Sequence, residues 1–182
     1  RMKFIEHRDG WRFGALTTIR DIETSEILGK AMPFLCQTAT ALGSVQIRNR
    51  ATVGGNLCNA SPCSNFGAMF LAMDATLRIL SGKGEKFVAL QDFFLGPNRT
   101  VLQKGEVLTE ILLPDDSDRS KGVFLKYSAG RSNDLGLVNI AVVLHRDPST
   151  GICKKIGIAM GAVAPTPMRA KRAESILINQ SL

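Results

Sequence analysis

The residues best suited to chemistry lie in one segment, residues 46–65, which contains two adjacent glycines and few bulky side chains. Gly54 and Gly55 lack a Cβ atom, so the backbone there can adopt positive φ angles and let another group come close. Successive amide N–H groups in such a turn can form a concave nest that binds anions. We therefore interpret the segment in two ways, as a loop that holds a phosphate or a dinucleotide backbone, or as an ordinary turn.

Short polar side chains surround the two glycines. Those with a hydroxyl or amide group are Thr52, Asn56, Asn59, Ser61 and Asn65. The apolar stretch Phe66–Met73 follows and predicts a helix. Its N-terminus would add a partial positive charge and free N–H groups beside the loop. Together the loop and the helix start favour anion binding, although the residue pattern alone leaves the ordinary turn open.

The elements that must position this segment are predicted from hydrophobic periodicity and turn residues. A hairpin is expected over residues 3–16, and a helix over Met32–Leu42, where Pro33 suits the first turn. Further strands are expected over residues 75–80, 86–89 and 107–113. The last part of the chain predicts strands over residues 123–128, 135–144 and 152–160, and then a helix over residues 168–178.

The charged run at residues 115–122 is the best linker candidate in the chain. It predicts two domains, residues 1–118 and residues 119–182. A chain of 182 residues is long enough for one good core or two small ones.

Composition narrows the class of protein. The net charge is +7, but the basic residues are dispersed and the chain has one Trp and one Tyr, so we expect no nucleic-acid partner. The excess charge suits a solvated face, a protein partner or an anionic cofactor. No apolar run is long enough to span a membrane, and the N-terminus has no hydrophobic signal region. We therefore expect a cytoplasmic protein.

The four cysteines do not form a metal motif. Cys58 and Cys63 are near each other, but Cys36 and Cys153 are isolated, and the closely spaced cysteines of an iron–sulfur site are absent. Reduced thiols are the favoured interpretation. A redox-active pair of Cys58 and Cys63 is the alternative.

A resemblance to a known family changes the interpretation of the glycine segment. Ala51–Leu57, followed by Asn59–Pro62, resembles the second FAD-binding motif in the flavoprotein subunits of molybdenum hydroxylases. This family includes the medium subunit of carbon monoxide dehydrogenase and the FAD-binding part of xanthine dehydrogenase. Further resembling segments occur in the family's order at Phe13–Thr18, Gln46–Asn49, Gly105–Leu108 with Leu113-Pro114, and Phe124–Tyr127 with Gly130-Arg131.

The resemblance implies an α+β fold. Residues 1–118 are expected to form a FAD-binding domain of the vanillyl-alcohol-oxidase or PCMH type. Residues 119–182 are expected to form part of the C-terminal α+β domain of a carbon monoxide dehydrogenase flavoprotein. No metal ligand, catalytic triad or acid–base pair is expected in the chain.

The resemblance also implies a set of FAD contacts. They are expected in the glycine segment at Thr52, Val53, Gly54, Gly55 and Asn56, and elsewhere at Leu42, Leu108, Lys126 and Asn65. Ser61 is added as a further polar contact. Without the resemblance, Leu42 and Leu108 would be interpreted as core residues and Lys126 as a solvated charge. Asn65 stands where relatives often have aspartate. Asparagine keeps an oxygen acceptor at this position but lacks the negative charge.

The implied function is electron transfer. A molybdopterin-binding large subunit hydroxylates a substrate, a small subunit carries the electrons through [2Fe–2S] clusters, and FAD in this subunit passes them to NAD⁺, oxygen or another acceptor. The alternative is a flavin-free assembly module of the same complex.

One departure from the family concerns an earlier FAD motif of the alanine-glycine-glycine-threonine type. Only thirteen residues precede Gly14, so that motif is missing. The family's C-terminal domain also normally runs past Leu182. We therefore expect a middle piece of the subunit, and a separate N-terminal FAD-binding segment is a further candidate partner.

Overall fold

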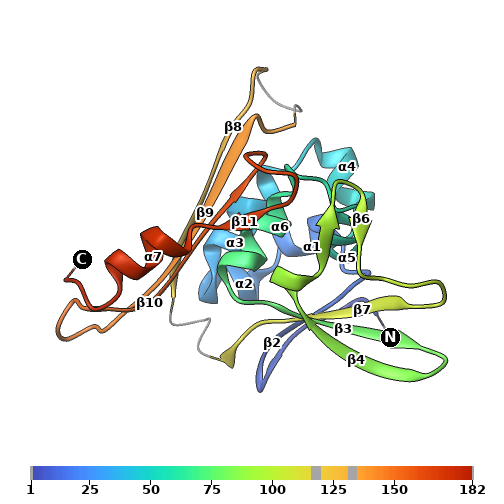
Figure 1. The fold of residues 1–182 in the computed structure, drawn as a ribbon, viewed down its shortest axis with the longest axis horizontal. Helices are drawn as coiled ribbons and strands as arrows, with labels where there is room; N and C mark the ends of the chain where they lie inside the picture. The colour runs from blue at the N-terminus through green and yellow to red at the C-terminus, as the bar shows by residue number, and fades with distance from the viewer. Residues whose placement is uncertain (1, 116–119, 131–134, 182) are drawn as a thin grey trace.

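A computed structural model describes residues 2–115, 120–130 and 135–181. Its first part is built on an antiparallel sheet of five strands in the order β1-β2-β7-β3-β4 (Figure 1). The strands are β1 (Ile5–Arg8), β2 (Gly10–Gly14), β3 (Thr76–Ser81), β4 (Gly84–Ala89) and β7 (Val107–Leu112). The predicted N-terminal hairpin is thus confirmed.

Six short helices cover one side of this sheet. They are α1 (Ile19–Glu23), α2 (Glu26–Ala31), α3 (Pro33–Thr40), α4 (Val45–Arg50), α5 (Val53–Cys58) and α6 (Asn65–Ala72). Residue types that favour a helix start stand at several of their N-termini. Thr18 forms a capping box with Asp21 at the start of α1, and Pro33 occupies the first turn of α3, which has no side-chain cap. A short helical turn η1 (Leu90–Asp92) and a two-stranded ribbon, β5 (Phe94–Gly96) with β6 (Arg99–Thr100), complete this part.

The second part is an antiparallel sheet in the order β11-β10-β9-β8. Its elements are β8 (Lys121–Tyr127), β9 (Val138–Arg146), β10 (Cys153–Gly161), β11 (Met168–Arg169) and the helix α7 (Lys171–Leu177). The predicted α+β class is confirmed. The predicted domain boundary, between residues 118 and 119, lies outside the described residues.

Helix α6 forms the centre of the molecule, since every one of its residues is buried. Its Phe70 ring packs on Phe13 of β2 in the first sheet, with ring centroids 5.6 Å apart. Its other side packs on β9 and β10 of the second sheet. Figure 1 shows the helical layer between the two sheets. One core therefore joins the two parts, and residues from both can form a common site.

A partly buried arginine stabilises the same junction. Arg169 of β11 donates to the carbonyl oxygen of Leu71 at 2.9 Å and pairs with the carboxylates of Asp74 and Glu174. Burial alone would lower the pKa of Arg169, but its hydrogen bonds to Glu174 and Asp74 outweigh it and raise that pKa. Arg169 therefore stays charged, and its charge-assisted hydrogen bonds tie the second sheet to the end of α6.

The outward face of the first sheet carries another paired charge. Glu110 of β7 is only 7% exposed and lies between Arg12 of β2 and Arg78 of β3. Burial would raise the pKa of Glu110, but the hydrogen bonds from the two guanidinium groups lower it. The charges of Glu110 and the two arginines therefore compensate one another.

Candidate functional site

The glycine segment is helical, so the prediction of a loop with positive φ is wrong. Thr52 is the N-cap of α5, and its hydroxyl accepts a hydrogen bond from the Gly55 amide at 3.0 Å. Neither Gly54 nor Gly55 has a positive φ angle. The preceding residues form α4, which is capped in the same way by Ser44. Caps of this type satisfy the free N–H groups of a helix start, and two short helices replace the expected loop.

The amide hydrogens of residues 53–56 are all engaged inside the protein. Those of Val53 and Gly54 donate to the carbonyl oxygen atoms of Thr17 and Ala15, each at 2.9 Å. The amide of Gly55 donates to the Thr52 hydroxyl. The amide of Asn56 donates to the Thr52 carbonyl oxygen, which is the first helical hydrogen bond of α5. The predicted nest of free amide groups is therefore wrong for this turn.

The two glycines have different structural roles. A Cβ atom on Gly54 would lie 2.6 Å from the Cβ atom of Ala15 and 2.7 Å from its carbonyl oxygen, so glycine lets α5 approach the end of β2 closely. Gly55 is exposed, and an added Cβ atom would meet only the hydroxyl of Thr52, at 2.9 Å. Gly54 thus serves packing, whereas Gly55 leaves a stretch of backbone open at the surface.

A cavity of about 210 Å³ lies where the helical layer meets the start of the second sheet. Five of the predicted contact residues line it: Leu42, Asn56, Ser61, Asn65 and Lys126. The cavity is completed by residues that were not predicted as contacts: Gly43, Ile47, Asn59, Cys63, Ser64, Leu135 and Gly136. The site therefore draws on both parts of the chain.

The other predicted contacts lie outside this lining. Thr52, Gly54 and Gly55 belong to the cap and first turn of α5, next to Asn56. Val53 and Leu108 are buried in the core. A sequence pattern selects neighbours along the chain, but only some of them face the cavity.

Amide and hydroxyl groups form the floor of the cavity. The Ser64 hydroxyl donates to Oδ1 of Asn56 at 2.7 Å and accepts from the Gly67 amide at 2.9 Å, which makes it the N-cap of α6. Asn65 is only 5% exposed, and its Nδ2 has no hydrogen-bond partner among the described residues. A buried donor without a partner is costly unless a ligand or water accepts from it. Asn65 therefore marks a place for an acceptor atom.

The second sheet contributes a cation to the lining and, beside it, an amide that holds a lining residue. Lys126 of β8 is half-buried, and its Nζ donates to the carbonyl oxygen of Ala41 at 3.2 Å. Asn139 lies directly opposite it on β9, is 1% exposed, and donates through Nδ2 to the Cys63 carbonyl at 3.2 Å. Sequence reasoning missed Asn139, because only the strand register places it beside Lys126.

The cysteines are free thiols. Cys63 lines the cavity, and its sulfur lies 3.1 Å from the Ser61 hydroxyl oxygen, whereas Cys58 does not line it. Burial raises the pKa of the Cys58 thiol, which makes it less nucleophilic at neutral pH. Among the described residues, no group of histidine, cysteine, aspartate and glutamate side chains could hold a metal ion.

The lining determines which ligands the cavity suits. It holds one ammonium group, several amide and hydroxyl groups, and the apolar side chains of Leu42, Ile47 and Leu135. Neither a carboxylate nor a histidine is among the described lining residues. Such a site fits a ligand that is rich in acceptor atoms, carries negative charge and has an apolar part. The described lining residues offer binding and electrostatics.

No helix in the described ranges is long and apolar enough to cross a membrane.

Two protein-family models match the chain. Residues 2–116 match the FAD-binding domain in molybdopterin dehydrogenase, and residues 123–182 match the C-terminal domain of the carbon monoxide dehydrogenase flavoprotein.

Individual relatives agree with these matches. The chain is 31% identical over 172 residues to the xanthine dehydrogenase FAD-binding subunit of Escherichia coli O157:H7, covering 94% of this chain and 58% of the relative. It is 32% identical over 174 residues to the glyceraldehyde dehydrogenase medium chain of Sulfolobus acidocaldarius. That match covers 96% of this chain and 60% of the relative.

Among solved structures, the chain is similar to a chain of a carbon monoxide dehydrogenase from Hydrogenophaga pseudoflava that lacks the Mo-pyranopterin moiety of its cofactor. The TM-score is 0.92 and the identity 30%, and the match covers 100% of this chain and 62% of the other. The chain therefore spans about three fifths of the length of the relatives it matches.

Proposed function

Because the chain belongs to the family of FAD-binding domains found in molybdopterin dehydrogenases, we propose that it binds FAD in the cavity between the helical layer and the second sheet. The family and the α+β fold predicted from the sequence are confirmed by the matches. The observation that carries the proposal is the lining itself. Lys126 and Asn65, whose Nδ2 has no partner among the described residues, line one partly apolar cavity.

The residues present fit such a cofactor. Lys126 would compensate part of the negative charge of FAD, and Asn65 would donate to one of its acceptor atoms. Leu42 would supply apolar contact, and Ser61 and Asn56 further polar contacts. When bound, FAD supplies redox chemistry that the side chains lack, and the protein contributes position and electrostatics.

The glycine turn has a revised role in this proposal. Since its amide hydrogens are engaged, we expect Thr52 and Gly55 to contact the cofactor through the hydroxyl group and the exposed backbone surface. Gly54 and Val53 would support that surface from below. A contact from Leu108, which is buried on β7, remains a prediction.

At the level of the whole protein, we propose a flavoprotein component of a molybdenum hydroxylase. Electrons from [2Fe–2S] clusters in a small subunit would reach FAD and pass to NAD⁺ or another acceptor. The molybdopterin cofactor would lie in a large subunit. A separate N-terminal FAD-binding segment remains a proposed partner. The relatives support this proposal, because they are FAD-binding or medium subunits of dehydrogenases.

A flavin-free assembly module is the second candidate. One observation favours it: all four amide groups at the start of α5 are engaged within the protein, so they cannot donate to a diphosphate as well. In that case the cavity would stay without flavin, and the chain would serve only to hold the partner subunits together.

Titration with FAD separates these candidates. We expect Lys126→Met to weaken FAD binding about tenfold or more, because a hydrogen bond to a charged group contributes about 1.5–3 kcal/mol and about 1.4 kcal/mol corresponds to tenfold. The measurement is quenching of flavin fluorescence by the purified 182-residue chain.

Lys121→Met is the matched control for this titration. Lys121 lies on the same strand, is exposed, and does not line the cavity. We expect it to bind FAD as the wild type does. Equal affinities in both variants would contradict the assigned role of Lys126. A colourless wild-type chain that still captures its partner subunits would support the assembly module.

A further inference from the structure

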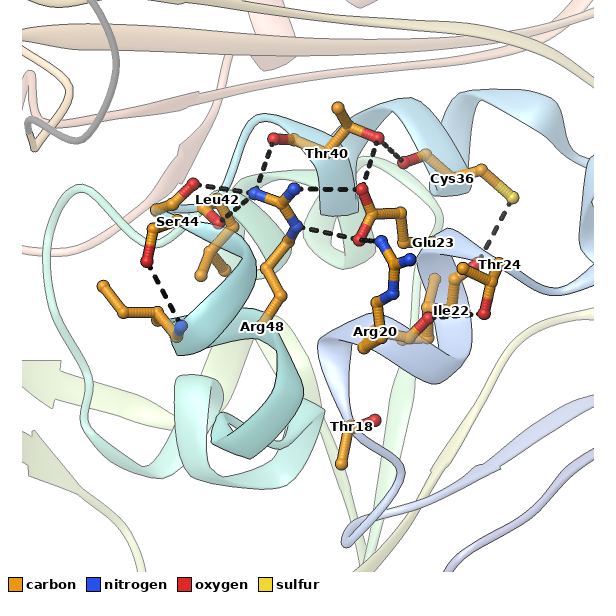
Figure 2. A network of polar contacts seen from close by, with 12 residues as sticks. Thr18, Arg20, Ile22, Glu23, Thr24, Cys36, Thr40, Leu42, Ser44 and Arg48 are labelled. Carbon is orange, nitrogen blue, oxygen red and sulfur yellow. Dashed lines mark hydrogen bonds and ion pairs between the residues drawn. The ribbon is translucent and has the colours of Figure 1, made fainter.

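Four consecutive carbonyl groups, from the last residue of α3 onward, accept hydrogen bonds from cationic side chains. Arg48 Nη1 lies 3.3 Å from the carbonyl oxygen of Thr40, 3.2 Å from that of Leu42 and 2.7 Å from that of Gly43 (Figure 2). The remaining carbonyl, that of Ala41, accepts from Lys126 of the second sheet. We call residues 40–43 the wall turn. Its carbonyl groups form the negative end of α3, where positive charge is stabilising.

Arg48 is itself held in place by a carboxylate. Its Nε donates to Oε2 of Glu23 at 2.8 Å, and its Nη2 donates to Oε1 at 3.0 Å, in a forked arrangement that Figure 2 shows. Arg48 is only 7% exposed, so this pair is screened little by solvent. Burial alone would raise the pKa of Glu23, but the hydrogen bonds from Arg48 and Arg20 lower it. Glu23 is therefore ionised at neutral pH.

The wall turn forms one side of the cavity. Leu42 and Gly43 line it, and so does Ile47, which precedes Arg48 on α4. Gly43 has a φ of 51°, a left-handed conformation that few residues other than glycine adopt readily. The conformation of this side of the cavity therefore depends on what holds the carbonyl groups of Leu42 and Gly43.

We propose that Glu23 and Arg48 are positioning residues for the cavity, with Glu23 orienting the Arg48 guanidinium so that it fixes the wall turn. Neither residue is needed to contact the ligand. The guanidinium is suited to this role because its donors form a rigid fork: two go to Glu23, and the third nitrogen faces the turn. A lysine ammonium group carries the same charge but lacks the fork. The identity of the ligand as FAD rests on the proposed function.

Arg48→Lys tests the positioning role with two readouts. We expect FAD affinity to fall about tenfold, by analogy with the lower end of the range for residues that orient the ligands of metal sites. We also expect faster hydrogen exchange at the Leu42 amide, which donates to the Ala39 carbonyl at 3.0 Å. The amide of Ala75, bonded to the Phe70 carbonyl at 3.0 Å, is the internal reference and should keep its rate.

Arg20→Lys is the matched control for the pair. Arg20 donates to the same carboxylate at 2.9 Å but has no hydrogen bond to the wall turn among the described contacts. We expect Arg20→Lys to have the FAD affinity and the Leu42 amide exchange rate of the wild type. Arg169→Lys controls for stability, because it should lower the melting temperature through the sheet junction and leave the Leu42 amide and FAD affinity unchanged.

The outcomes distinguish the two proposals. If Arg48→Lys has the wild-type hydrogen-exchange rate at the Leu42 amide and the wild-type FAD affinity, the positioning role is overturned. It is also overturned if the ratio of lost FAD affinity to lost melting temperature is the same in Arg169→Lys as in Arg48→Lys, because the loss of affinity would then follow from lower stability. If the wild-type chain binds no FAD, the proposed ligand fails, but the exchange rates still decide the positioning role. Faster exchange at Leu42 in Arg48→Lys alone would support it, and equal rates in all variants would refute it.

Discussion

Gly157→Ala is expected to destabilise the protein by about 3 kcal/mol, at the upper end of the usual cost of overpacking a core. Gly157 lies on β10 where that strand crosses α6, and an added Cβ atom would be 1.8 Å from the carbonyl oxygen of Ala72. The obstacle is backbone within a fully buried helix, so no side-chain rotation can relieve it. The two sheets would have to separate at the core that joins them.

Urea unfolding followed by circular dichroism measures this loss. Gly29→Ala is the control, because Gly29 lies within α2 and an added Cβ atom would meet nothing within 4 Å. Alanine in a helix is more favourable than glycine by about 0.5–1 kcal/mol, so this variant should be as stable as the wild type or more so. A Gly157→Ala protein with wild-type stability would contradict the packing of α6 against β10.

The two glycines of the family motif should respond differently to alanine. Gly54→Ala places a methyl group against the backbone and Cβ atom of Ala15, so it should lower stability by about 2 kcal/mol. Gly55→Ala meets only the Thr52 hydroxyl, so its cost should be limited to disturbing a helix cap, about 1 kcal/mol. Gly55→Ala should nevertheless weaken FAD binding, because it covers exposed backbone and displaces the Thr52 hydroxyl.

Unfolding and FAD titration of the two variants check this separation. The expected result is a large loss of stability in Gly54→Ala, and in Gly55→Ala a loss of affinity that exceeds the loss of stability. If Gly55→Ala binds FAD normally, the cofactor does not approach the turn at that residue. If both variants are fully stable, the close contact between α5 and Ala15 is incorrect.

Much of the fold was predictable from local patterns. The alternation before Gly14 identifies the first hairpin, Thr18 caps α1, and Pro33 begins α3. The apolar run after Asn65 is α6, which is apolar on all sides because sheets cover both of its faces. These features depend on residues close together in the sequence, so reasoning from short segments finds them.

The glycine segment was mispredicted for a physical reason. Two adjacent glycines favour a loop locally, but the Thr52 cap and hydrogen bonds to Thr17 and Ala15 stabilise a helix start. Those carbonyl groups lie more than thirty residues earlier in the chain, so no local pattern reveals them. Tertiary contacts outweighed a propensity of about 1 kcal/mol per glycine.

The site was predictable only in part for the same reason. Lys126 followed from the family resemblance, because a lysine in a strand otherwise suggests a solvated charge. Asn139 and Arg48 do not line the cavity but hold residues that do. The register of β8 with β9 places Asn139 beside Lys126, and a carboxylate on α1 orients Arg48. Both depend on pairings between distant segments that composition and spacing do not encode.

Alkylation of Cys63 with and without FAD tests most directly whether the flavin occupies this cavity. Cys63 is a free cysteine that lines the cavity, whereas Cys36 does not line it and serves as the internal control. At an FAD concentration ten times the Kd, about one molecule in eleven remains open, so alkylation by N-ethylmaleimide should slow about tenfold at Cys63. Mass spectrometry of the peptides should show an unchanged rate at Cys36. A chain that binds FAD yet alkylates at Cys63 at the same rate as the free protein would contradict the proposed site.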